Sequence, residues 1–127
     1  MGLYWKDIEI TPGMILEVDE ENYEVFDETG RRARIAWKIL AIRERTGEEA
    51  FYDTHTGKTF SLRKVMKNRR LSRKQDERTL IQIPACTDYL VIEEFHNGSP
   101  AFKRCYSVDM LGLIRNMRIV ETPGSSS

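Results

Sequence analysis

Residues 33–43 read ARIAWKILAIR, and from Arg34 to Ile39 small or charged side chains alternate with large apolar ones. A period of two residues is typical of a β-strand with one face in the core and one in water. The predicted inward face comprises Ile35, Trp37 and Ile39. The continuously apolar run 39–42 fits a bulge, a strand covered on both faces or the start of a helix. Its β-branched residues and short length favour a strand.

Shorter stretches of the same kind lie on both sides of this strand and are separated by turn residues. Residues 14–18 and 23–27 are predicted to pair as a hairpin, with the acidic turn 19–22 between them. Further strands are predicted at residues 50–52, 59–60, 79–83, 89–92 and 101–106. Most of the chain is therefore expected to be β-structure.

A helix is predicted to begin after Ser61, because the apolar period there changes from two residues to about three and a half. Its predicted inward side comprises Leu62, Val65 and Met66. We expect the helix to end near Arg69 or Arg70, because its continuation would place Leu71 in water. Residues 72–76 then suit a flexible connection.

A second short helix is predicted over residues 107–115, with Ser107 as its cap. The sequence partly repeats itself at this point, since residues 60–62 resemble 106–108 and residues 67–71 resemble 115–119. Two copies are compatible with a duplicated hairpin-and-helix unit and equally with coincidence.

The N-terminal part of the chain resembles a known type of barrel. Residues 10–19, ITPGMILEVD, followed by Tyr23, Glu24 and Val25, resemble the opening hairpin of small SH3-like barrels such as the first domain of translation elongation factor P. Residues 33–35 and 45–47 continue in that style. The resemblance covers about 40 residues, and it implies a barrel but no particular function.

These patterns predict a mainly β, α+β fold, built as a small SH3-like barrel or a bent antiparallel meander with two short helices. A length of 127 residues fits a single compact domain. We expect this domain to span residues 1–121 and the polar segment 122–127 to be a disordered tail. The alternative is two β-rich halves, 8–71 and 79–121, joined by a basic linker, 72–78.

Charge is sorted along the chain, although the formal net charge is zero. Residues 17–28 hold seven carboxylates and no base, whereas residues 61–78 hold eight cations and two carboxylates. Local charge of this kind sets the electric field that a partner meets. Each block is therefore a candidate binding surface.

The basic block predicts contact with the phosphates of a nucleic acid, because cations on one helical face, followed by a basic linker, suit a regular array of anions. The candidate residues are Arg63, Lys64, Lys67, Arg70, Arg73 and Lys74. The alternative is a solvated helix whose cations pair with the acidic hairpin of the same molecule. The sequence holds no helix-turn-helix, zinc-finger or RNA-recognition signature, so we expect no base-specific readout.

The acidic block supports a second hypothesis, in which a rim of carboxylates binds a basic surface of another protein, as an inhibitor or interaction module does. The candidate residues are Glu17, Asp19, Glu20, Glu21, Glu24 and Asp27. The alternative is an exposed turn that carries these residue types for solubility and turn geometry.

An enzyme is the least supported hypothesis. His55 and His96, each near a turn glycine, could serve as acid and base in a ribonuclease-like cleavage, but nothing in the sequence brings them together. With Cys86 and Cys105 they match a zinc ligand inventory, yet the spacings lack the paired short-range ligands of structural zinc sites. We therefore expect no catalytic site, no metal and no cofactor.

The expected setting is cytoplasmic. The two cysteines are too few for a disulfide scaffold, and the N-terminus lacks the features of a secretory signal. No apolar run approaches the roughly 20 residues of a membrane-spanning helix. The small size and separated charge blocks fit a regulatory protein of the kind that phages and mobile elements encode.

Overall fold

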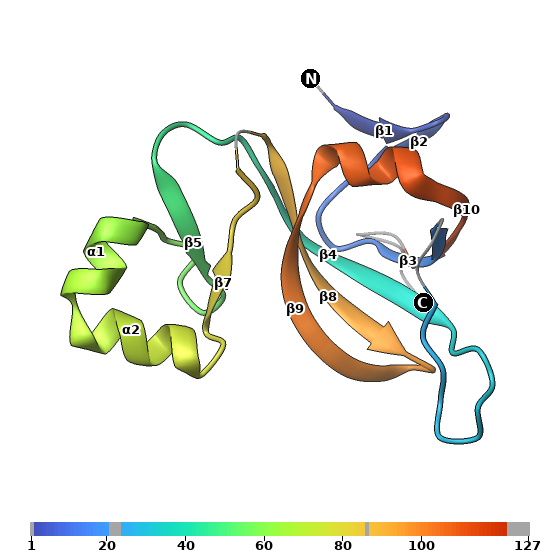
Figure 1. Cartoon of the computed structure of the whole chain (residues 1–127). Helices are drawn as coiled ribbons and strands as arrows, with labels where there is room; N and C mark the ends of the chain where they lie inside the picture. Colours follow the sequence, from blue (N-terminus) through green and yellow to red (C-terminus); the bar gives the residue numbers. More distant parts are fainter. Residues whose placement is uncertain (1, 21–23, 86, 122–127) are drawn as a thin grey trace.

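The computed structural model describes residues 2–20, 24–85 and 87–121, and about half of them lie in antiparallel strands (Figure 1). The described elements, in chain order, are β1 (Leu3–Trp5), β2 (Ile8–Ile10), β3 (Ile15–Glu20), β4 (Ile35–Arg43), β5 (Glu49–Asp53), β6 (Thr59–Ser61), α1 (Leu62–Lys67), α2 (Arg69–Asp76), β7 (Leu80–Gln82), β8 (Tyr89–His96), β9 (Ser99–Ser107), the short 3-10 helix η1 (Val108–Leu113) and β10 (Ile114–Glu121). The predicted mainly β, α+β class is confirmed.

The strands form three sheets. The largest has the order β10-β3-β4-β8-β9, and two smaller ones have the orders β1-β2 and β6-β5-β7. The small sheet of β5, β6 and β7 carries α1 and α2 and forms a lobe beside the main sheet (Figure 1). Because β10 and β9 are free edges of the main sheet, the described strands form bent open sheets, and the barrel implied by the resemblance does not close.

Strand β4 follows the predicted alternation. Ile35, Trp37 and Ile39 are buried, whereas Lys38 is exposed. A register shift between Ile39 and Ala41 opposite β8 places a bulge in the apolar run. Beyond the bulge both faces of the sheet are covered, because Ile42 packs on one cluster while Ala41 packs on another.

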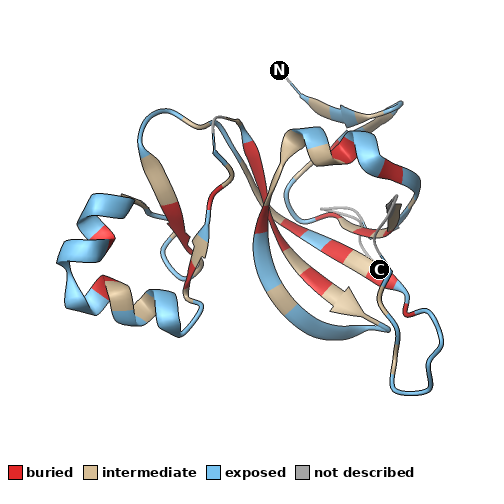
Figure 2. Cartoon of the chain, in the orientation of Figure 1, coloured by how far each residue is buried: buried red, intermediate tan, exposed pale blue. Residues whose placement is uncertain are grey.

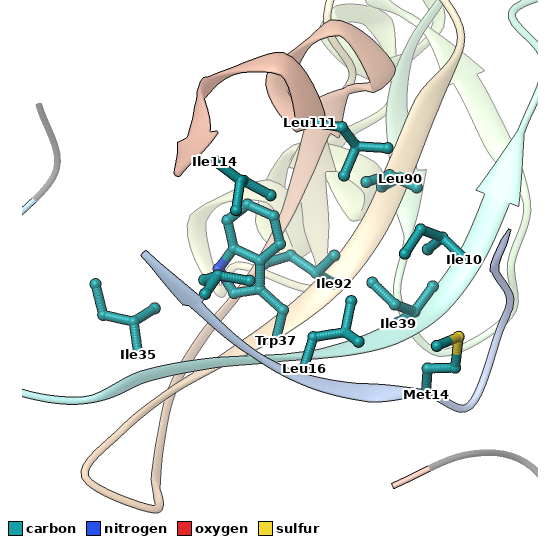
Figure 3. Packing of buried hydrophobic residues seen from close by; sticks show 11 residues of the cluster. Ile10, Met14, Leu16, Ile35, Trp37, Ile39, Leu90, Ile92, Leu111 and Ile114 are labelled. Carbon is teal, nitrogen blue, oxygen red and sulfur yellow. The ribbon is translucent and has the colours of Figure 1, made fainter. Parts of the chain in front are cut away.

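The main core lies on one face of the large sheet. Figure 3 shows the Trp37 ring between Ile114, Ile92 and Leu16. Trp37 is 0% exposed, and its indole N–H donates to Oε1 of Glu94 at 3.0 Å. The large Trp37 side chain is therefore buried together with Glu94, which accepts a hydrogen bond from the indole nitrogen, the one polar atom of that side chain.

The predicted hairpin of residues 14–18 and 23–27 is wrong. Strand β3 pairs with β4 on one side and with β10 on the other, while the chain from Glu24 to Arg34 forms a loop with a single bridge between Phe26 and Arg32. Residues 21–23 lie outside the described residues. Strand β10 takes the place of the expected partner because it offers apolar side chains to the core and arginines to the acids of β3.

Asn97 and Gly98, two of the turn residues that separate the predicted strands, form the tight turn between β8 and β9. Asn97 has a φ of 50° and Gly98 a φ of 83°. A two-residue hairpin turn of type I′ needs positive φ at both positions, which Asn-Gly tolerates best. The Asn97 side chain also accepts a hydrogen bond from the Arg34 backbone N–H at 2.9 Å, so the turn is tied to the strand next to it.

The first predicted helix begins where expected and ends earlier. The Ser61 hydroxyl accepts from the Lys64 backbone N–H, and α1 ends at Lys67. The predicted flexible connection 72–76 is wrong, because these residues belong to α2. The predicted inward side is also wrong in part, since Val65 is buried but Leu62 and Met66 are 53% and 73% exposed.

The second predicted helix is confirmed as η1, which Ser107 caps through a hydrogen bond from the Asp109 backbone N–H. The sequence similarity around Asn68 and Asn116 does not extend to structure, because Asn68 separates two helices and Asn116 lies in β10. The two ranges 8–71 and 79–121 share the main sheet through the pairing of β4 with β8 and of β3 with β10. The tail 122–127 lies outside the described residues.

Candidate nucleic-acid interface

The helices α1 and α2 form the outer layer of the small lobe. Figure 2 shows both helices mainly as exposed surface, with a buried position in each. Val65 and Leu71 are these buried residues, and they pack with Phe51 and Leu80 of the small sheet. The two helices are thus held by a small apolar core, and their remaining faces meet solvent.

Six cations on these helices are exposed. They are Arg63, Lys64 and Lys67 on α1, and Arg69, Arg70 and Arg73 on α2. We call this set the basic surface. Within residues 2–20, 24–85 and 87–121, none of the six forms an ion pair. Five of the six predicted phosphate-binding residues lie in this set.

Arg69 was missed by the sequence argument, and Asn68 explains why. A continuous helix would have put Arg69 against the core and Leu71 in water, as the sequence predicted. Instead Asn68 adopts an extended conformation and its side chain accepts from the backbone N–H groups of Arg70 and Leu71. The helix restarts with a new phase, so that Leu71 faces inward and Arg69 faces water. Asn68 as a helix N-cap was the available signal.

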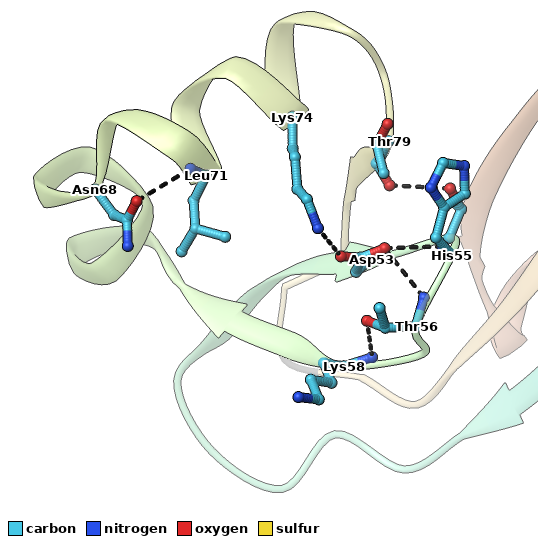
Figure 4. A network of polar contacts seen from close by, with 9 residues as sticks. Asp53, His55, Thr56, Lys58, Asn68, Leu71, Lys74 and Thr79 are labelled. Carbon is cyan, nitrogen blue, oxygen red and sulfur yellow. Dashed lines mark hydrogen bonds and ion pairs between the residues drawn. The ribbon is translucent and has the colours of Figure 1, made fainter.

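Lys74, the sixth predicted residue, is not part of the basic surface. Its ammonium Nζ lies 2.9 Å from Oδ2 of Asp53, a carboxylate that is 1% exposed (Figure 4). Burial is the largest single influence on the Asp53 carboxyl, and by itself it would raise the pKa of that group. The Lys74 hydrogen bond and the backbone N–H groups of His55 and Thr56 together outweigh burial, so the pKa of Asp53 lies below its ordinary value. Lys74 therefore serves to join α2 to β5.

Apolar side chains lie beside the cations. Leu62 and Met66, four residues apart on α1, are among the large exposed hydrophobic residues of the described chain. The Lys64 ammonium lies 5.4 Å from the centre of the Phe60 ring, which holds that cation near the strand that enters α1. The basic surface thus offers both charge and apolar contact area to a partner.

The acidic residues are largely engaged within the chain. Glu17 pairs with Arg118 at 2.8 Å, and Asp19 pairs with both Arg32 and Arg115 at 2.7 Å. The Arg115 hydrogen bond is the strongest influence on Asp19 and holds its pKa below the ordinary value. The acids on β3 therefore join β10 and the adjoining loop to the main sheet.

The other acidic candidates lie in or near the loop that follows β3. Asp27 accepts hydrogen bonds from the Thr29 hydroxyl and from the backbone N–H groups of Thr29 and Arg31, and its pKa is lowered, chiefly by the Thr29 hydroxyl. Glu24 is exposed. Glu21 lies outside the described residues, and of Glu20 only the backbone, in β3, is described. The acids that the structure describes do not lie together on one hairpin.

The two histidines lie in separate parts of the molecule. His55 is exposed in the turn that follows β5 of the small lobe. His96 ends β8 opposite Ile35, and its Nε2 lies 2.6 Å from Oε2 of the buried Glu94. Among the described residues no three His, Cys, Asp or Glu side chains gather as a metal ion would need, and Cys86 lies outside that part of the chain.

Cys105 is buried, and burial raises the pKa of its thiol to about 12. A thiol with such a pKa holds its proton at neutral pH and is a poor nucleophile, because the thiolate is the reactive form. The side chain instead packs with Val91 and Ile83 in the cluster on the second face of the main sheet.

Comparison with known proteins gives no match, whether to a family model, to a curated protein or to a solved structure. None of the helices within the described residues has the length and apolar character that crossing a bilayer requires. The basic surface is therefore interpreted from its own chemistry.

Proposed function

We propose that this protein is a non-enzymatic accessory or regulatory protein that binds the phosphate backbone of a nucleic acid through the basic surface. The observation that carries the proposal is the group of six exposed cations on two consecutive helices, without an ion pair in the described chain. The segment 62–76 holds seven cations and one carboxylate, so this part of the surface is strongly positive. Cations that neutralise phosphates release the counterions condensed on the nucleic acid to solution, which favours binding.

The placement of the acidic residues supports this proposal over the acidic-module alternative. Glu17 and Asp19 are occupied by arginines of β10 and of the neighbouring loop, so they neither neutralise the basic surface nor stand free for a basic partner. A basic partner would first have to displace those arginines. The proposal also places the protein in the cytoplasm, where a reduced Cys105 thiol is expected.

The test is a salt series of binding to generic DNA and RNA. The variant Lys67→Glu/Arg70→Glu reverses one charge on each helix. We expect it to lower the affinity at least about ten-fold and to reduce the slope of log K against log salt by about 2, one for each lost phosphate contact. The matched control is Arg31→Glu/Arg34→Glu, which reverses the charge of two exposed arginines. Both belong to the segment between β3 and β4, which lies far from α1 and α2 (Figure 1).

Two results would contradict the proposal. One is a wild-type protein that binds neither DNA nor RNA at low salt. The other is a helix variant that binds as tightly as the control, since the two variants change the net charge equally. Thermal unfolding of both variants shows whether they remain folded.

A further inference from the structure

A groove lies between the two lobes, where the free edge of β7 faces the free edge of β9. Its volume is about 570 Å³. The floor is apolar and includes Ile81, Ile83 and Cys105, which belong to the cluster on the second face of the main sheet. The groove therefore lies over the side chains that pack the two lobes against each other.

The rim of the groove is cationic. Arg78, Lys103 and Arg104 line it, and no carboxylate is among the lining residues in the described chain. Arg78 lies two residues after the end of α2, so the groove begins where the helical segment of the basic surface ends. Charge complementarity and this continuity both point to an anionic occupant that also lies on the basic surface.

The spacing of the two strands argues against an inserted β-strand. A strand that pairs with both edges would hold them about 9.5 Å apart, twice the usual distance between neighbouring strands. Cα atoms of β7 and β9 approach within 8 Å of each other. Where the two strands are this close, an acidic peptide cannot lie between them as a strand hydrogen-bonded to both sheets.

The chemistry of the groove suits unpaired bases. At the free edge of β9, on the opposite face of that strand from Cys105, the Arg104 guanidinium lies 4.3 Å from the centre of the Phe102 ring. A guanidinium supported in this way offers a flat face on which a base can stack as the strand crosses this edge. Leu62 and Met66 offer apolar contact beside the cations of α1. In a duplex the bases are paired and stacked, and such apolar surfaces would gain little from its phosphate backbone.

We infer that the bound nucleic acid is single-stranded and that its strand runs from the basic surface into the groove between β7 and β9. This inference rests on the proposed function and adds the class of nucleic acid and the path of the strand. The cations of the helices and of the rim hold successive phosphates, while the apolar floor and the Arg104–Phe102 stack receive bases.

The test compares a labelled oligothymidylate and oligouridylate with a duplex of the same length, for wild type and for Lys103→Ala/Arg104→Ala. We expect wild type to bind the single strands more tightly than the duplex, and the groove variant to lose about ten-fold in single-strand affinity. The matched control is Arg31→Ala/Arg34→Ala, which removes the same charge elsewhere. Where thermal unfolding shows the double variant to be less stable than the control, Lys103→Gln alone replaces it.

The outcomes separate this inference from the proposed function. Equal or tighter binding of the duplex, or a groove variant that binds single strands as well as the control does, overturns the inference while the basic surface stands. An oligoglutamate that binds as tightly as the oligothymidylate also overturns it, in favour of an acidic protein partner. Failure of wild type to bind any nucleic acid removes the proposed function and the inference together.

Discussion

Glu94 is 0% exposed, although it carries a carboxyl group in the core of the main sheet. Its Oε1 accepts hydrogen bonds from the Trp37 indole at 3.0 Å and from the Tyr106 hydroxyl at 3.4 Å, and its Oε2 lies 2.6 Å from His96. A buried carboxyl group is tolerated only when protein partners replace its hydrogen bonds to water. These contacts link β4, β8 and β9, so they favour one register of the central strands over its neighbours.

We expect the Trp37–Glu94 hydrogen bond to be measurable in a double-mutant cycle of Trp37→Phe and Glu94→Leu, because phenylalanine lacks the donor and leucine lacks the acceptor. Each single change should destabilise the fold, and the coupling free energy should be about 0.5–1.5 kcal/mol, the usual net contribution of a hydrogen bond. The measurement is urea unfolding of the four proteins, followed by far-ultraviolet circular dichroism. Additive effects of the two changes would show that the bond contributes nothing beyond packing.

The sequence predicted Trp37 as a core residue, because its position in an alternating strand is a local property. It did not predict Glu94 as its partner, since the two residues are 57 positions apart and a glutamate is ordinarily exposed. The basic surface was predicted for the same local reason, as most of its members lie within a short helical segment. Lys74 was placed there wrongly, because its partner Asp53 comes from another element.

Asn68 determines how two short helices share one surface. Its backbone N–H donates to the Val65 carbonyl at the end of α1, and its side chain caps the start of α2 (Figure 4). Substitution Asn68→Ala should destabilise the protein by about 1 kcal/mol, the usual effect of losing an N-cap. The check is the midpoint of urea unfolding. Asn68→Asp keeps a capping oxygen and is the control, so an equal loss in both variants would contradict the capping role.

Elements whose apolar pattern is local were predicted well, and those set by distant pairing were not. The strand around Trp37, the Asn97-Gly98 turn and the caps Ser61 and Ser107 all follow from residues within a few positions. The hairpin after β3 failed because β10, about 100 residues along the chain, pairs with β3 instead. Its first residues were predicted to end a helix, and no strand was predicted over residues 116–121. A single sequence gives little information on such long-range pairing.

At the scale of the whole molecule, the zero net charge results from two different arrangements. The acids of β3 form ion pairs with arginines of β10 and of the loop that follows β3. These ion pairs hold segments together that are distant in the sequence. The six cations of the basic surface receive no such partners within the described residues. The separation of charge seen along the sequence therefore persists in space as an uncompensated positive surface on the small lobe.

The paired carboxylates predict how the stability of the whole fold depends on pH. Asp53 has a pKa below its ordinary value of 3.8, so its ion pair with Lys74 stabilises the fold fully above that pH and is lost as pH falls further. Asp53→Asn resembles the protonated side chain. The variant should therefore be less stable than wild type at neutral pH, and the difference should shrink as pH drops through 3.8 and below. Urea unfolding across this range measures it, with Asp7→Asn in the exposed turn after β1 expected to follow wild type. A difference that stays constant with pH would show that Asp53 stabilises the lobe by hydrogen bonds alone and not by its charge.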